Sequence, residues 1–470
     1  MKLKFIKSVL FFTLVISFLL TGSNKSFAGL DPLYEAALQS SLNQLRTSYN
    51  IPGMSAIVIL PEGTWEGTSG ISDSGSTMTY SHSFGIGSIT KNIIAATILK
   101  LQEKNLLNID DKIIMYLPRY DNIDSNITIR ELLQHTSGIY NFTNNPQYSA
   151  AINANLDSVW NPENVLQFVL APNFQHGTSW AYSNTNYILL GLIIEEVYKM
   201  PLHEAYQKLL LTNHFLGGLS LFPFEEYTGP LAHNWVDLNG DGILDDASFI
   251  PKTAIFSGAW GAGAIISRPQ KLAFYAMQLF GGELLEPQSM QQMTTFRNVS
   301  FGNVNGYGLG LMRYTNVAGR TVWGHGGNVF GYASIMMHVP QDTITAVICS
   351  NRDLSTTNFG LPFMNTVITQ RPVGIQPISQ EIPSSFELKQ NYPNPFNPET
   401  TIEFKISGDE FTNLNVYDIN GRLVETLVNE KLQAGIYKMK WSGANVSSGV
   451  YYYTLKTENF SETKKMILLK

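Results

Sequence analysis

The sequence has 470 residues, of which 44% are hydrophobic and only 14% charged, and its formal net charge is −6. This composition excludes a disordered, coiled-coil or collagen-like chain, because apolar residues are plentiful and no short repeat is present. At this length two folded domains are expected, and the acidic balance makes nucleic acid an improbable partner, since no basic stripe is available to neutralise phosphates.

Residues 1–28 have the pattern of a secretory signal peptide. Lysines at the start precede an apolar run over 9–20, and Ser26 and Ala28 place small residues at −3 and −1 of a cut after Ala28. The run is shorter than the roughly 20 residues that a membrane span needs. We therefore expect a secreted protein without a transmembrane span after processing, and its net charge becomes −10 because the segment carries four lysines and no acid.

The chain has one cysteine, Cys349, in an apolar run. One thiol cannot form an internal disulfide, so the exported protein must be held together by its cores. Cys349 is expected to be a buried strand residue and not a nucleophile.

The first 370 residues contain strands at both ends and helices between them. Apolar spacing predicts a helix at 33–47, strands at 54–60 and in a run ending near 84, and a helix at 88–104. Further helices are predicted at 129–134, 162–170, 187–198 and 202–211, and strands at 308–314, 321–324, 333–339 and 343–350. This order predicts an α/β or α+β domain over 29–370 whose terminal strands share one sheet.

A second composition begins near residue 371. The segment 371–398 includes a stretch rich in Pro and Asn and is interpreted as a linker. The domain over 399–470 is predicted to be a small β-sandwich without catalytic residues. Asn420 and Gly421 predict a type I′ hairpin turn. The predicted strands are 401–407, 414–419, 422–428, 436–441, 450–457 and 466–470.

Four motifs in this tail resemble the C-terminal sorting domain of the type IX secretion system of Bacteroidetes-like bacteria. They are Tyr392-Pro-Asn-Pro-Phe-Asn-Pro398, Val416-Tyr-Asp-Ile-Asn-Gly-Arg422, Gly435-Ile-Tyr437 and Ser448-Gly-Val-Tyr-Tyr452. The resemblance implies an immunoglobulin-like sandwich, a partner in the outer-membrane secretion machinery, and release from or attachment to the surface of a Gram-negative bacterium. An ordinary carbohydrate-binding or adhesive β-module is the alternative.

Ser88 and Lys91 open the predicted helix at 88–104. A spacing of three residues places the Lys91 amine one turn above Ser88 on the same face, with a rise of about 4.5 Å. A serine at a helix start also lies beside free backbone N–H groups, which suits an acyl oxyanion. Taken alone, the pair is better explained as a capping serine followed by a solvated lysine.

Two further groups favour catalysis. Tyr182-Ser-Asn184 lies just before a helical run, and Trp323-Gly-His325-Gly326-Gly327-Asn328 lies on a predicted strand. Because Gly326 and Gly327 have no side chains, a substrate backbone is expected to approach this strand and pair with it.

The three groups together resemble the motifs of the serine penicillin-recognising family, which contains class C β-lactamases, D-alanyl-D-alanine carboxypeptidases and related esterases. The resemblance spans roughly 30–370, and the segments 132–138, 260–263 and 307–310 agree with it. It implies a β-lactamase/transpeptidase-like fold with an antiparallel sheet and a helical region.

The resemblance also implies roles for single residues. Ser88 is the nucleophile, and Lys91 and Tyr182 form the proton-transfer pair, without a choice between them. Asn184 holds Lys91 and the substrate amide. The backbone N–H groups of Ser88 and Asn328 form the oxyanion hole.

Histidines need separate interpretation. His325 stands where the lactamases have lysine and should be largely neutral at pH 7. This weakens a lactamase function and leads us to expect that activity on carboxylate-bearing substrates rises as His325 protonates. His135 is interpreted as part of a structural turn near the site, and His203 as a helix surface residue that lacks the second histidine of a zinc protease.

Asp237, Asn239, Asp241 and Asp245 match positions 1, 3, 5 and 9 of a calcium loop. Position 12 is Ser248 in place of a glutamate. Structural calcium and a simple surface turn therefore both stay open.

The sequence predicts a secreted serine hydrolase that forms an acyl-enzyme on Ser88 and needs no cofactor for catalysis. D-alanyl-D-alanine carboxypeptidase-like activity is the first hypothesis, and an esterase or β-lactamase with the same site is the second. A non-catalytic surface binding protein is the third. The expected substrate is accordingly a small peptide, an ester or a β-lactam.

Overall fold

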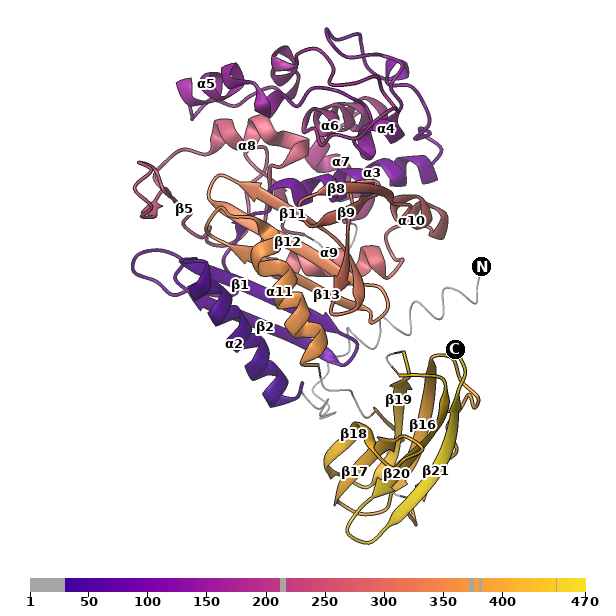
Figure 1. The fold of residues 1–470 in the computed structure, drawn as a ribbon. Coiled ribbons are helices and arrows are strands. Elements are labelled where there is room, and N and C mark those ends of the chain that lie inside the picture. Colours follow the sequence, from indigo (N-terminus) through magenta and orange to yellow (C-terminus); the bar gives the residue numbers. More distant parts are fainter. Residues whose placement is uncertain (1–29, 212–216, 372–375, 380–382, 445) are drawn as a thin grey trace. The chain divides into compact units, whose positions relative to one another are not determined.

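The computed structural model describes residues 30–211, 217–371, 376–379, 383–444 and 446–470. The chain divides into two compact units, one ending at Gln370 and the other beginning at Arg371 (Figure 1). The signal peptide predicted at 1–28 lies outside the described residues. No helix in the described ranges is long and apolar enough to cross a membrane.

An eight-stranded antiparallel sheet forms the centre of the first unit, with strand order β2-β1-β13-β12-β11-β10-β9-β8. Its strands are β1 (Gly53–Leu60), β2 (Gly63–Gly70), β8 (Arg297–Phe301), β9 (Val304–Tyr307), β10 (Met312–Val317), β11 (Arg320–Val329), β12 (Tyr332–Val339) and β13 (Ile344–Ser350). The register of β1 and β13 runs from Met54 opposite Ser350 to Ile59 opposite Thr345. Strands from the two ends of the unit therefore share one sheet, as predicted.

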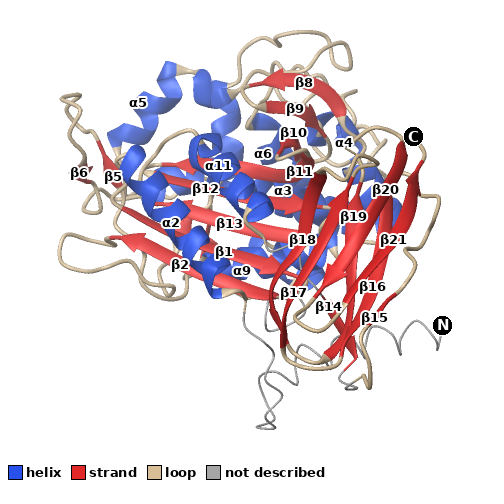
Figure 2. Cartoon of the chain, turned by 60° about the horizontal axis from the view of Figure 1, so that its bottom comes forward, coloured by secondary structure: helices blue, strands red, loops and turns tan. Residues whose placement is uncertain are grey.

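Helices cover both faces of this sheet. Figures 1 and 2 show α2 (Pro32–Ser48) and α11 (Thr356–Thr369) on one face, and α9 (Pro269–Phe280) packs on the other. Each face of the sheet has its own hydrophobic core, and successive residues of β1 pack into opposite cores. Ala56 packs with α2 and α11, and Ile57 packs with α9. Burial on both faces explains the nearly continuous apolar sequence of the central strands. Cys349 is buried in β13, as expected.

The remaining helices form a second layer around α3 (Thr90–Glu103). Every residue of α3 from Thr90 to Leu99 is buried, so it is a core helix, apolar on most sides, that packs against α6 and α7. The other α-helices are α4 (Ile129–Leu133), α5 (Pro146–Ala154), α6 (Thr185–Tyr198), α7 (Leu202–Leu210), α8 (Thr253–Ala259) and α10 (Pro287–Met293). The described 3₁₀ turns are η1 (Gly87–Ile89), η2 (Ile113–Met115), η3 (Phe142–Asn144), η4 (Pro162–Phe168) and η6 (Trp260–Ala262).

Two helix predictions need correction. The helix predicted from residue 88 begins with the 3₁₀ turn η1, and the segment predicted as a helix at 162–170 is the 3₁₀ turn η4. Short strands complete the unit: β3 (Phe84–Gly85), β7 (Ile265–Ser267) and β4 (Leu219–Leu221) form one small sheet, and β5 (Trp235–Val236) pairs with β6 (Asp245–Asp246).

The second unit contains two four-stranded antiparallel sheets, ordered β14-β19-β16-β15 and β18-β17-β20-β21. Their strands are β14 (Gln376–Ser379), β15 (Glu387–Leu388), β16 (Glu399–Ile406), β17 (Glu410–Tyr417), β18 (Leu423–Leu432), β19 (Gly435–Ser442), β20 (Gly449–Lys456) and β21 (Ser461–Leu468). Apolar side chains from both sheets, including Phe404 and Tyr453, share one core. The segment predicted as a linker, 371–398, supplies β14 and β15 and so belongs largely to this unit.

The predicted hairpin joins β17 and β18, but its turn is not type I′. Type I′ requires a positive φ at both central residues, and of Asn420 and Gly421 only Gly421 has one, +75°. Asp418 and Arg422 close a three-residue loop, and the Asp418 carboxylate accepts hydrogen bonds from the backbone N–H groups of Asn420 and Arg422. The carboxylate thus stabilises a longer turn than the Asn-Gly pair alone predicts.

Candidate active site

Ser88 lies in η1, the turn that enters α3, and this turn lies directly against β11. A Cβ atom on Gly87, whose φ is +51°, would come within 2.5 Å of the Asn328 nitrogen. A Cβ on Gly327 would come within 2.0 Å of the Ile86 carbonyl oxygen and 2.6 Å of the Ser88 nitrogen. The two glycines therefore bring the backbone N–H groups of Ser88 and Asn328 together, as an oxyanion hole requires.

The glycines of β11 have a structural role that was not predicted. A Cβ on Gly326 would meet Thr356 Oγ1 of α11 at 2.2 Å, and a Cβ on Gly327 would meet η1, so both positions make room for other parts of the protein. The edge of β11 is also open. The pairing of β10 with β11 runs only from Val317 opposite Arg320 to Met312 opposite Gly324, and no other described strand pairs with 325–329 on that side.

Lys91 lies beside Ser88, with its Nζ 3.0 Å from Ser88 Oγ. The same nitrogen donates a hydrogen bond of 2.6 Å to the Ala262 carbonyl oxygen. The side chain is fully buried, and this burial holds the pKa of Lys91 well below its usual value. In its neutral form, which burial favours, the Lys91 amine keeps one N–H on the Ala262 carbonyl and can offer its lone pair to the Ser88 hydroxyl proton.

The backbone carbonyl of Ala262 is part of the site and was not predicted from the sequence. It belongs to the motif 260–263, which we noted only as agreeing with the family resemblance. Trp260 has φ +36° and begins η6, and this turn aims the Ala262 carbonyl at Lys91. The motif 260–263 thus has a physical purpose: the strained backbone at Trp260 directs the Ala262 carbonyl, which holds Lys91 by a hydrogen bond.

Tyr182 completes the cluster. Its ring centre lies 5.0 Å from Lys91 Nζ. Burial raises the pKa of the Tyr182 phenol, and a hydrogen bond with Ser88 lowers it in part, so the phenol keeps its proton at neutral pH. The structure thus brings together Ser88, Lys91 and Tyr182 from two segments that are far apart in sequence.

Asn184 does not hold Lys91, contrary to our expectation. Its Nδ2 donates to Thr143 Oγ1 at 3.1 Å, and its backbone N–H donates to Asn141 Oδ1. The Ala262 carbonyl takes the place that we expected for Asn184. Asn184 stands at the start of α6, so its first role in this geometry is to join α6 to the preceding loop.

His325 is fully buried next to the site. Its Nδ1 lies 2.6 Å from the Gly326 carbonyl oxygen, and its Nε2 lies 3.0 Å from the Tyr307 hydroxyl. Burial, with the nearby Lys91, lowers the pKa of His325 to about 3. The imidazole is neutral at pH 7, as expected, but the predicted rise in activity as it protonates falls outside the neutral range. Asn328 turns its side chain away and donates to the Leu354 carbonyl oxygen.

An aromatic wall over the site was not predicted. The Phe301 ring stacks on Tyr182 at 5.7 Å with an interplanar angle of 4°, and Trp180 lies 5.8 Å from Phe301. Phe301 is 45% exposed at the end of β8. An apolar ring held in solvent beside the nucleophile cluster offers a surface to an apolar substrate group.

Comparison with known proteins agrees with this geometry. The model of the Beta-lactamase family matches residues 38–366. The chain belongs to the Beta-lactamase family. It therefore has the fold shared by β-lactamases and penicillin-binding proteins, and its three motifs were assigned to this family correctly.

Relatives within this family include penicillin-binding proteins and amide hydrolases. Penicillin-binding protein 4* of Bacillus subtilis (strain 168) is 24% identical over 58% of this chain, and the putative penicillin-binding protein PbpX of the same strain is 29% identical over 49%. The matches cover 61% and 53% of these two proteins, so the chain spans only about half to three fifths of their length.

Two solved structures are similar over most of their length. A D-stereospecific amidohydrolase from Streptomyces sp. is 29% identical with a TM-score of 0.61, and the match covers 67% of this chain and 94% of that one. The D-amino acid amidase from Ochrobactrum anthropi SV3 is 22% identical with a TM-score of 0.64, covering 72% and 99%, which shows a shared fold.

The second unit matches the Secretion system C-terminal sorting domain over residues 390–469. This confirms the second resemblance that we drew from the sequence. The β-lactamase family enzyme is therefore exported by type IX secretion, to the cell surface or into the medium.

The loop predicted to bind calcium is closed by its own hydrogen bonds. The Asp237 carboxylate accepts from the backbone N–H groups of Gly240, Asp241 and Gly242, and Asp245 accepts from that of Leu238. Across the described ranges, no group of three or more His, Cys, Asp or Glu side chains is arranged to hold a metal ion.

Calcium binding by this loop therefore stays a prediction from sequence, and thermal unfolding tests it. A bound ion at 100 times its Kd stabilises a protein by about 2.7 kcal/mol, so calcium should raise Tm relative to EDTA. The rise should disappear in Asp237→Ala, which removes the first position of the loop. An identical Tm in calcium and EDTA would rule the ion out.

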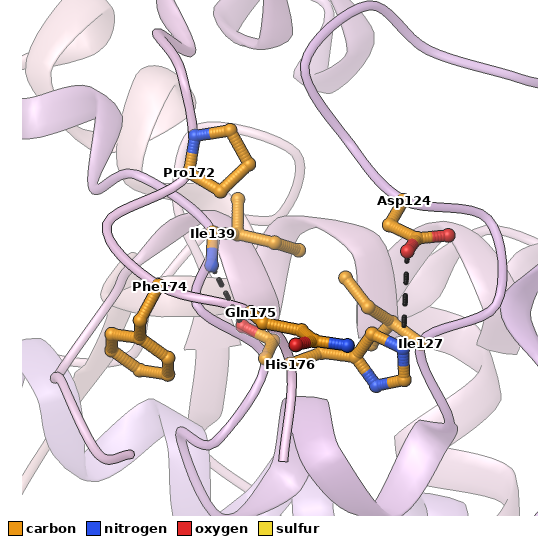
Figure 3. Close-up of a pocket in the computed structure, with 8 residues that line it drawn as sticks. Asp124, Ile127, Ile139, Pro172, Phe174, Gln175 and His176 are labelled. Atoms are coloured by element: carbon orange, nitrogen blue, oxygen red, sulfur yellow. Dashed lines mark hydrogen bonds and ion pairs between the residues drawn. The ribbon is translucent and has the colours of Figure 1, made fainter. Parts of the chain in front are cut away.

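A cavity of about 290 Å³ lies elsewhere, beneath the loop 172–176 (Figure 3). Figure 3 shows His176 beside Asp124, at 3.8 Å, and the other nitrogen of His176 lies 2.9 Å from Glu131 Oε1. None of the predicted catalytic residues lines this cavity. This cavity is therefore separate from the Ser88 cluster.

Proposed function

We propose that this enzyme hydrolyses amide bonds in small substrates that contain D-amino acids and carry no negative charge next to the scissile bond. The observation that carries the proposal is the charge of the site. Of the site residues described above, Lys91 and His325 could carry a positive charge, and burial lowers the pKa of both, that of His325 to about 3. Burial thus disfavours a cation that would attract a substrate carboxylate, and similarity to a D-stereospecific amidohydrolase supports an amide substrate.

The reaction follows from the contacts around Ser88. Lys91, 3.0 Å away, accepts the Ser88 hydroxyl proton while Oγ attacks the substrate carbonyl carbon. The backbone N–H groups of Ser88 and Asn328 stabilise the oxyanion. Tyr182, whose phenol stays protonated, passes a proton to the leaving nitrogen and is reprotonated from Lys91. Water then hydrolyses the acyl-enzyme, and the free edge of β11 holds the substrate backbone during both steps.

D-alanyl-D-alanine carboxypeptidase-like activity is the second candidate. It is favoured by the relatives named penicillin-binding proteins, and it requires the site to accept a free carboxylate. Esterase or β-lactamase activity would use the same residues. We also propose that the sorting domain has an immunoglobulin-like topology. This topology concerns export, and hydrolysis does not depend on it.

A substrate panel tests the proposal. The full chain is assayed with a D-amino acid amide, a peptide ending in D-Ala-D-Ala, nitrocefin and a short acyl ester, each alongside Ser88→Ala. We expect the amide to exceed the free-carboxylate peptide in kcat/KM by about 10-fold or more, the scale of about 1.4 kcal/mol of transition-state stabilisation. A faster carboxylate peptide would favour the carboxypeptidase, and no turnover with no covalent penicillin label would favour a binding protein.

A further inference from the structure

Behind the site, two histidines are joined through one tyrosine. His135 Nε2 lies 3.2 Å from the Tyr307 hydroxyl oxygen, and the same oxygen lies 3.0 Å from His325 Nε2. All three side chains are fully buried. The three residues come from the loop after α4, from β9 and from β11, and the reaction described above gives none of them a chemical step.

The hydrogen bonds that join His135, Tyr307 and His325 form a short hydrogen-bonded chain, and its direction is fixed at the His325 end. The Gly326 carbonyl oxygen, 2.6 Å from His325 Nδ1, can only accept, so Nδ1 carries the imidazole proton. Burial keeps His325 neutral, which leaves a lone pair on Nε2. The Tyr307 hydroxyl must therefore donate its proton to His325.

The direction is fixed independently at the His135 end. The backbone N–H of Ser183 lies 3.2 Å from His135 Nδ1 and can only donate. Asn186 Nδ2 lies 3.1 Å from the same atom and also donates to the Leu132 carbonyl oxygen, which identifies it as the amide nitrogen. His135 Nδ1 is therefore an acceptor, and the neutral ring carries its proton on Nε2.

The two ends agree on a single order of donors. His135 donates to the Tyr307 oxygen, Tyr307 donates to His325, and His325 donates to Gly326. Tyr187 also adjoins His135 and interacts with the Tyr307 hydroxyl, but it donates its own hydroxyl proton to the Leu133 carbonyl oxygen at 2.8 Å and so can only accept from Tyr307. The lone pair of the buried His325 Nε2, 3.0 Å from the Tyr307 hydroxyl, still requires the Tyr307 proton.

The ends of the chain lie at two functional parts of the site. The His135 ring centre is 4.3 Å from that of Tyr182, and His135 also binds the N–H of the next residue, Ser183. At the other end, His325 stands on β11 and binds the carbonyl of Gly326, where the free edge begins. A change in one hydroxyl would loosen both parts, because each histidine would lose a buried partner.

We propose that Tyr307 is a positioning residue whose hydroxyl, through His135 and His325, locks Tyr182 and the substrate-binding edge of β11 into one arrangement. This inference rests on the proposed function only in that Tyr182 and β11 take part in the reaction. The order of protons along the chain does not depend on any substrate.

Imidazole nitrogen shifts test the order of protons directly. Full-length protein is labelled with ¹⁵N-histidine, and the two rings are assigned with His135→Gln and His325→Gln. We expect His135 as the Nε2–H tautomer and His325 as the Nδ1–H tautomer, both neutral at pH 7. The opposite tautomer of either ring would overturn the inference, whether or not the protein hydrolyses any substrate.

Tyr307→Phe tests the positioning role, with Tyr332→Phe as the matched control. Tyr332 is a buried tyrosine of β12 whose hydroxyl donates to the Ala232 carbonyl oxygen at 2.5 Å, outside the chain. On the best substrate of the panel, Tyr307→Phe should lower kcat by about 10- to 100-fold with little change in KM, since small misplacements cost about this much. Tyr332→Phe should stay close to wild type.

Equal kcat values for the two variants would overturn the positioning role, as would a loss confined to KM. If Tyr307→Phe does not fold, the tautomers of the wild-type protein still decide the inference. Inactivity of the wild-type protein on the whole panel, with the expected tautomers present, would count against the proposed function and leave the proton order standing.

Discussion

Replacing Ser88 by alanine is expected to remove hydrolysis and covalent labelling together. Loss of the nucleophile in a serine hydrolase costs about 10⁴- to 10⁶-fold in kcat, because the other members of the site cannot act without it. The fold should persist, since Lys91 keeps its hydrogen bond to the Ala262 carbonyl oxygen. The measurements are turnover of the best panel substrate and labelling by a fluorophosphonate probe and a labelled penicillin.

Ser55→Ala is the matched control for this substitution. Ser55 is fully buried in β1, and its Oγ has no hydrogen-bond partner among the described residues, so its removal should change neither labelling nor turnover. Labelling of Ser88→Ala at the wild-type rate would show that another residue is the nucleophile. Loss of activity in both variants would point instead to general damage of the fold.

Replacing Lys91 by methionine is expected to lower activity strongly without lowering stability. Removal of a general base costs about 10²- to 10⁴-fold, and Lys91 is the group 3.0 Å from the nucleophile. Methionine has a similar length and no charge to bury, so the variant should be at least as stable as wild type. Activity is measured on the panel substrate, and stability is measured as Tm.

The pH dependence of stability sharpens this prediction. The pKa of Lys91 is lowered in the folded state, so between that pKa and the ordinary value of 10.5 the unfolded chain binds more protons. Wild-type stability from this group therefore rises with pH across this window, and the advantage of Lys91→Met should shrink as pH approaches 10.5. Lys100→Met, also on α3 but paired with Glu103 near the surface, is the matched control and should keep full activity. Wild-type activity in Lys91→Met would indicate that Tyr182, and not Lys91, is the general base.

Local patterns in the sequence predicted much of the fold. Apolar residues that recur at regular intervals predicted the strands at 54–60, 333–339 and 343–350. The same kind of pattern predicted the helices α3, α4, α6 and α7. Both helices that cover the sheet late in the chain, α9 and α11, were missed, and α11 contains Pro362, which argues against a helix on local grounds. The turn at Asn420 was assigned to the wrong type because the Asp418 side chain takes part in it.

The sequence by itself determined the family, the order of the three motifs, the one-turn spacing of Ser88 and Lys91, and the sorting domain. All of these depend on residues that are close in the chain or on short motifs with a fixed order. Only the tertiary structure decided that the Ala262 carbonyl, 171 positions away, holds Lys91. It also decided that burial lowers the pKa of His325 to about 3, and that Gly326 and Gly327 make room for other segments of the protein. Burial and the direction of a hydrogen bond depend on what distant segments bring to each atom, and spacing along the chain does not record this.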